Sequence, residues 1–121
     1  MLDGMGTSVS EIAATLRASE RRRRAQAEAR AQRLLRDVPR ARELLRSRYA
    51  VARVVLFGSL ATGDVSPRSD VDLAVLGLEP ARYFDALADL MELFGSPVDL
   101  VRIEEAPTSL RERIAAEGKE A

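Results

Sequence analysis

Residues 57–76, FGSLATGDVSPRSDVDLAVL, carry the most informative pattern of this chain. One apolar run ends at Gly58 and Ser59, and after ten intervening residues a second run contains Asp70 and Asp72. Because successive side chains of a strand point to opposite faces, two aspartates one residue apart share a face. Two carboxylates on a short, partly buried strand repel one another, and a hard divalent cation relieves that repulsion. The pattern therefore predicts a Mg²⁺ site beside a Gly-Ser turn.

A third carboxylate, Asp99, interrupts the apolar run PVDLV at residues 97–101. We expect this run to form a strand beside the one with the paired aspartates, so that Asp99 joins them as a metal ligand or a base. Taken alone, Asp99 would be interpreted as a charge that keeps an edge strand soluble.

The charge count favours a nucleotide as the ligand of these carboxylates. Three carboxylates and a triphosphate carry about seven negative charges, and two Mg²⁺ ions would supply about four positive ones while holding the reacting oxygens. The remaining balance must come from Arg side chains, backbone N–H groups or a helix N-terminus. Gly58 lets the backbone approach a phosphate closely, and the Ser59 hydroxyl can donate to its oxygens.

The composition removes several other kinds of chemistry. The 121 residues contain no Cys and no His, which excludes disulfides, thiolate nucleophiles, the usual zinc sites and His-based triads. No run approaches the ~20 apolar residues of a membrane span, and the N-terminus lacks the pattern of a signal peptide. We therefore expect a cytoplasmic protein that uses carboxylate, hydroxyl, guanidinium and metal chemistry.

The net charge of zero hides an asymmetry along the chain. Residues 1–50 contain 12 Arg and 6 acidic residues, whereas residues 51–121 contain 7 basic and 13 acidic ones. The run Arg21–Arg24 has no interleaved aromatic residue, so base stacking is not indicated. We interpret this run as a solvated helix face or a docking surface for a partner, with an arm that binds RNA or DNA phosphates as the less favoured alternative.

The remaining pattern predicts an α/β fold in which helices pack on a small mixed sheet. Ser8 and Glu11 fit a capping box that starts a long Arg-rich helix after a loose end at residues 1–7, and Asp37-Val38-Pro39 predicts a stop and a restart. The other predicted elements are strands over 52–57, 70–76 and 97–103, a loop over 58–69 with a helical turn after Ser59, a helix over 80–94 closed by Gly95, and a last helix capped by Thr108 or Ser109. We expect one domain, with a helical segment over 1–49 and the core over 50–121.

The few aromatic residues are expected in the core. Tyr83, Phe84 and Phe94 recur at helical spacing, which predicts burial. Tyr49 could be a target of self-modification, but packing beneath the first strand is the simpler interpretation.

The motif L-F-G-S-x(10)-D-V-D-L, followed by a strand with a lone Asp, resembles the nucleotidyltransferases of the DNA polymerase beta superfamily. The likeness covers residues 50–103 and is nearest to the minimal nucleotidyltransferases, which are often paired with a HEPN-domain protein in toxin–antitoxin operons. It implies a nucleotidyltransferase fold and the transfer of a nucleoside monophosphate to a hydroxyl with release of pyrophosphate. For members with a HEPN partner, it implies an antitoxin that transfers AMP from ATP to a tyrosine of the toxin.

The resemblance also assigns roles to individual positions. Gly58 and Ser59 match the residues that bind the triphosphate, and Asp70 and Asp72 match the paired metal ligands. Asp99 matches the third carboxylate, which helps to activate the attacking hydroxyl.

One position departs from the family pattern. Family members commonly read GS-x-A-R-G, and this chain has Thr62 where the Arg is usual. The resemblance predicts weaker nucleotide binding unless Arg68 or a partner residue supplies the charge, so we include Arg68 among the nucleotide-binding residues.

Two hypotheses follow for the function. The first is a Mg²⁺-dependent transferase of AMP from ATP to a HEPN-like toxin, whose cleft is completed by the partner or by a second copy of the chain. The second is a binding module that neutralises its partner by docking alone.

Overall fold

A computed structural model describes residues 8–121 of the chain, and the expected loose end at residues 1–7 lies outside this range. The elements are α1 (Val9–Tyr49), β1 (Arg53–Phe57), α2 (Ser59–Thr62), β2 (Val71–Leu76), η1 (Pro80–Arg82), α3 (Tyr83–Phe94), β3 (Val98–Arg102), η2 (Ile103–Glu105), α4 (Thr108–Glu117) and β4 (Lys119–Glu120). The predicted α/β class is confirmed, with a mixed sheet and a long Arg-rich helix at the N-terminal side. Among residues 8–121, every helix is too short or too polar to span a bilayer.

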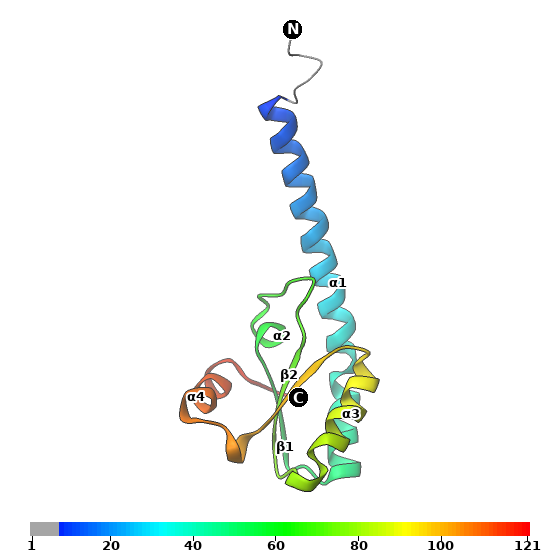
Figure 1. The fold of residues 1–121 in the computed structure, drawn as a ribbon, viewed down its shortest axis with the longest axis vertical. Coiled ribbons are helices and arrows are strands. Elements are labelled where there is room, and N and C mark those ends of the chain that lie inside the picture. The colour runs from blue at the N-terminus through cyan, green and yellow to red at the C-terminus, as the bar shows by residue number, and fades with distance from the viewer. Residues whose placement is uncertain (1–7) are drawn as a thin grey trace.

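The sheet has the strand order β3-β2-β1-β4. β1 runs antiparallel to β2 and β4, and β2 runs parallel to β3. As Figure 1 shows, this arrangement brings the end of β1 and the start of β2 to the same end of the sheet. The short strand β4 was not predicted, because two residues are too few to show an alternating pattern.

The first helix is continuous over 41 residues. It begins as predicted, with the Glu11 N–H donating to the Ser8 hydroxyl at 3.1 Å. The predicted stop before Pro39 is wrong, since Pro39 lies inside the helix. A proline removes one backbone hydrogen bond, but the neighbouring Val38 and Ala41 are buried in the core, and this packing holds the helix together. Residues near the N-terminal end of α1 project beyond the sheet (Figure 1).

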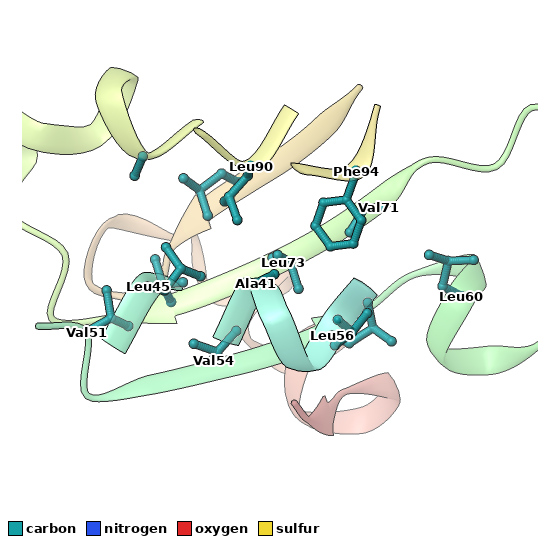
Figure 2. Packing of buried hydrophobic residues seen from close by; sticks show 14 of the residues in the cluster. Ala41, Leu45, Val51, Val54, Leu56, Leu60, Val71, Leu73, Leu90 and Phe94 are labelled. Carbon is teal, nitrogen blue, oxygen red and sulfur yellow. The ribbon is translucent and has the colours of Figure 1, made fainter. Parts of the chain in front are cut away.

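Each face of the sheet has its own helices. α1 and α3 cover one face, where Leu45, Leu73 and Leu90 meet in the main core (Figure 2). α4 covers the other face through a smaller cluster that includes Phe57 and Ile114. The alternation predicted for β2 is confirmed, because its odd-numbered positions Val71, Leu73 and Val75 are all buried in the main core.

Two aromatic predictions have different outcomes. Phe84 is 77% exposed, so its predicted burial is wrong, whereas Phe94 is buried as expected. Tyr83, at the start of α3, points toward the sheet, and its hydroxyl donates a hydrogen bond to the Leu100 carbonyl at 2.5 Å. The side chain of the following residue, Phe84, consequently points to the solvent. Tyr49 is 5% exposed and packs in the core, as its simpler interpretation predicted.

The helix ends agree in part with the sequence signals. Gly95 closes α3 in the left-handed conformation, with φ 61°, as predicted. The predicted cap of the last helix is wrong, because α4 already begins at Thr108 and Pro107 takes the cap position. Proline has no N–H group to leave unsatisfied there.

Candidate active site

Three of the predicted site residues come from different strands and meet at one end of the sheet. Gly58 directly follows β1, and Asp72 and Asp99 are the second residues of β2 and β3. In the strand register, Phe57 faces Asp72, and Asp72 lies beside Asp99. The expected adjacency of the strands that carry Asp72 and Asp99 is confirmed.

Gly58 packs directly against the Asp72 side chain. Its backbone has φ 70° and ψ −155°, a conformation that is almost confined to glycine. A Cβ atom added at Gly58 would lie 2.1 Å from Asp72 Oδ2 and 2.9 Å from its Cγ. Two features of the turn after β1 therefore require glycine at position 58. One is the backbone conformation, and the other is the short distance to the Asp72 carboxylate.

A single helical turn, α2, follows Gly58 and begins with Ser59. The Thr62 N–H donates to the Gly58 carbonyl at 3.0 Å, which folds the turn back on the end of β1. Ser59 is partly exposed, and Thr62 is exposed at the far end of the turn. The helical turn predicted after Ser59 is thus confirmed.

The Asp72 carboxyl is the most perturbed acid of the site. Burial raises its pKa to about 6, and the negative charges of Asp99 and Asp70 act in the same direction. Arg113 of α4 opposes this shift, and Glu117 adds to it. Burial and the acidic neighbours thus disfavour the ionised Asp72 carboxylate, and a bound cation would stabilise it.

The oxygen donors at this end of the sheet are of the type that Mg²⁺ prefers. Within residues 8–121, no three acidic side chains converge closely enough to form a metal cage by themselves. Magnesium is commonly held by one or two carboxylates together with substrate phosphates. The aspartates, with the perturbed Asp72 at their centre, therefore fit a cation that is shared with a nucleotide.

Two arginines near the site have different surroundings. Arg68 is exposed and lines a groove of about 620 Å³ together with Arg22 and Arg23 of α1. Arg113 lies over the Phe57 ring, with its guanidinium carbon 5.7 Å from the ring centroid. The positive charge that acts on Asp72 is that of Arg113.

A family model described as polymerase beta, nucleotidyltransferase, matches residues 40–120. The chain belongs to this nucleotidyltransferase family. The match begins inside α1, so most of this long helix lies outside it. No protein of curated function is similar enough in sequence to count as a relative.

Several solved structures resemble this nucleotidyltransferase. A crystal structure of a toxin–antitoxin with AMP-PNP is 32% identical over 64% of this chain and 66% of that chain, with a TM-score of 0.59. The tri-AMPylated Shewanella oneidensis HEPN toxin in complex with its MNT antitoxin gives 26% identity, 72% and 70% coverage and a TM-score of 0.59. A candidate minimal nucleotidyltransferase gives 30% identity, 71% and 93% coverage and a TM-score of 0.59. The chain spans about two thirds of the length of the toxin–antitoxin chains that it matches, and the resemblance to minimal nucleotidyltransferases is confirmed.

The sequence did not point to two basic residues that the fold brings to this candidate site. Arg113 comes from the last helix, and Arg30 of α1 reaches Asp70, with 3.5 Å between Nη2 and Oδ1. Neither belongs to a motif. In the structure, Arg30 lies between Ala27 and Ala31, which are both buried, but the sequence alone does not show this.

Proposed function

We propose that this nucleotidyltransferase transfers AMP from ATP to a hydroxyl group of a partner protein, a tyrosine, and that the partner is a HEPN-like toxin silenced by the modification. The observation that carries the proposal is the arrangement of Asp72 and Asp99 on neighbouring strands, with Gly58 against Asp72 and Asp70 just before β2. The similar structures that contain AMP-PNP and an AMPylated HEPN toxin support the choice of nucleotide and acceptor. ATP and such a partner imply a cytoplasmic location.

In this proposal, Asp70, Asp72 and Asp99 would hold Mg²⁺ together with the nucleotide phosphates, and Gly58 and Ser59 would contact the triphosphate. Bound Mg²⁺ would neutralise phosphate charge and favour an in-line displacement. Asp99 is exposed at the start of β3 and takes the proton of the acceptor hydroxyl, whose oxygen bonds to the α-phosphorus. The bond from that phosphorus to the bridging oxygen breaks, and pyrophosphate leaves with the electron pair.

The positive charge beside the nucleotide comes from arginine. Thr62 cannot provide it, and Arg68 was the substitute expected from the sequence. Arg113 is better placed than Arg68, because it lies over Phe57, next to the Gly58 turn, and its charge acts on Asp72. We retain Arg68 as a nucleotide contact and add Arg113 to it.

The projecting part of α1 is the proposed docking surface for the partner. Val9, Ile12 and Leu16 are 84%, 47% and 62% exposed and recur at helical spacing, and the exposed basic run Arg21–Arg24 follows them. Apolar and basic side chains along one helix fit a protein with an acidic surface. This part of α1 projects from the end of the sheet where β2 begins (Figure 1). Asp72 and Asp99 lie at that same end, so a partner that follows the helix down to the sheet would reach them.

Labelling with α-³²P-ATP tests the proposal. The chain, its HEPN-like partner and Mg²⁺ are incubated together, and label on the partner is expected. The double variant Asp70→Asn/Asp72→Asn should lose the label by at least about 100-fold, because both proposed metal ligands lose their charge. Asp64→Asn is the matched control, since Asp64 is an exposed acid of the preceding loop and should label normally. Equal labelling by the double variant would show that the aspartates are not the active site.

Neutralisation by docking alone is the second candidate function. The observation that favours it is that the aspartates do not form a preformed three-carboxylate cage within residues 8–121, together with Thr62 at the position of the usual Arg. This function predicts that the chain silences the toxin without ATP, and that Asp70→Asn/Asp72→Asn silences it equally well. A toxin activity assay with and without ATP separates the two candidates.

A further inference from the structure

Arg30 lies on α1, outside the matched residues 40–120, yet its side chain reaches the end of the sheet that carries the aspartates. Its Nε donates to the Ser69 carbonyl at 2.8 Å, and its Nη2 donates to the Ser96 hydroxyl at 2.9 Å. The same Nη2 lies 3.5 Å from Asp70 Oδ1. One guanidinium therefore contacts the loop before β2, the loop before β3 and the first aspartate.

The two serines that Arg30 contacts are themselves buried. Ser69 is 9% exposed and Ser96 is 8% exposed, and polar groups removed from water need hydrogen-bond partners. β2 and β3 start side by side, with Val71 paired to Val98. Arg30 thus joins the two segments that lead into these parallel strands, and each contacted serine lies two residues before its strand begins.

The shape of the arginine side chain matters for these contacts. A guanidinium is a planar fork that can donate in several fixed directions at once, whereas a lysine ammonium is a compact point charge. The Arg30 side chain is 22% exposed, and that of Asp70 is 47% exposed. A lysine at this position would keep the positive charge but could not reproduce the three contacts together.

From these contacts we infer that Arg30 is a positioning residue of the active site, which fixes the direction of the Asp70 carboxylate and the spacing of the β2 and β3 starts. The N-terminal helix then belongs to the catalytic machinery, although the family match leaves this part of it out. The inference rests on the proposed function, in which Asp70 is a metal ligand. Groups that orient a metal ligand typically change metal affinity or activity by about 10- to 100-fold when they are replaced.

The substitutions Arg30→Lys and Arg30→Gln separate position from charge. Calorimetry gives the Mg²⁺ affinity with a non-hydrolysable ATP analogue bound, and the labelling assay gives kcat and the KM for ATP. Positioning predicts that both variants lower kcat by about 10- to 100-fold and weaken Mg²⁺ binding by about 10-fold, with little change in KM. If Arg30 acted through its charge alone, Arg30→Lys would match the wild type and Arg30→Gln would bind Mg²⁺ more tightly, since a repelling cation is gone. That result would overturn the inference.

Variants at two further positions serve as controls. Arg40 lies on the same helix and pairs with Asp37 at 3.4 Å, so Arg40→Lys and Arg40→Gln should change neither kcat nor Mg²⁺ affinity. Ser96→Ala removes one acceptor of Arg30 and leaves every charge in place, and a kcat about 3- to 10-fold lower is expected. An unchanged kcat in Ser96→Ala, with melting confirming that the protein is folded, would count against positioning.

The inference and the proposed function can fail separately. A wild-type chain that binds Mg²⁺ but transfers no AMP would contradict the proposed function, while the calorimetry would still decide the role of Arg30. A wild-type chain that binds no Mg²⁺ even with a non-hydrolysable ATP analogue present would overturn both.

Discussion

Replacing Asp72 by Asn should stabilise the metal-free protein, although it removes a residue of the proposed site. Burial, followed by the charges of Asp99 and Asp70, raises the pKa of the Asp72 carboxyl from 3.8 to about 6. The folded state therefore binds this proton more tightly than the unfolded state, so the free energy of unfolding falls as the pH rises through this range. The destabilisation that the ionised Asp72 carboxylate causes is absent below about pH 4 and fully present above about pH 6.

The size of this cost follows from the shift. A change of about two pKa units corresponds to about 3 kcal/mol, at about 1.4 kcal/mol per unit. Asp72 is only half-buried, and the solvent screens its repulsion from the exposed Asp99, so a gain of about 1–2 kcal/mol is the realistic expectation. In a domain of this size, such a gain would raise Tm by about 3–8 °C.

Urea denaturation with a chelator present measures the effect across this pH range. Asp72→Asn should exceed the wild type by about 1–2 kcal/mol near pH 7, and the difference should vanish near pH 4. Asp70→Asn is the matched control, because the Asp70 charge is paired with Arg30 and its removal should bring no gain. A lower stability of Asp72→Asn at pH 7, or an equal gain at both pH values, would refute the electrostatic explanation.

Three further predictions concern separate parts of the fold. Gly58→Ala places a methyl group 2.1 Å from a carboxylate oxygen and should cost more than about 3 kcal/mol, whereas Gly63→Ala, with φ 86° but open space, should cost about 1 kcal/mol by the same urea assay. Pro39→Ala restores a backbone hydrogen bond inside α1 and should stabilise the protein by about 1–3 kcal/mol; an unchanged urea midpoint would mean that the helix has already adapted to the proline. Tyr49→Phe removes a 2.5 Å hydrogen bond to a carboxylate of α3 and should cost about 1 kcal/mol without changing AMP transfer, whereas loss of label from this chain itself would identify Tyr49 as a modified residue.

The sheet and the aspartates could be predicted because their signals are local. The alternation of β2 places Val71 and Leu73 on one face and Asp72 on the other, and a short run of sequence shows this directly. Gly58 ends its strand at a position where other residues would be strained, so it also leaves a local signal. The alternation of strand residues and the conformation required at the turn therefore predict the aspartates and Gly58.

The course of α1 and the basic residues depend on contacts that no local window contains. Asp37-Val38-Pro39 has the signals of a helix boundary, and only the burial of Val38 in the main core reverses them. Arg30 contacts serines that are 39 and 66 residues away in the chain. Such contacts become visible only when the fold is known.

The charge asymmetry of the chain gains a physical meaning from these contacts. Among residues 8–121, two arginines of α1 form ion pairs with the rest of the fold, Arg30 with Asp70 and Arg48 with Asp89. The run Arg21–Arg24 stays exposed, and burial together with its acidic neighbours keeps the pKa of Asp72 raised. The proposed cation with its nucleotide at the aspartates, and the proposed acidic partner surface along the projecting helix, would each supply a counter-charge. Because Arg30 belongs to the same helix as the exposed run, a partner that shifts α1 would also shift the group that holds Asp70.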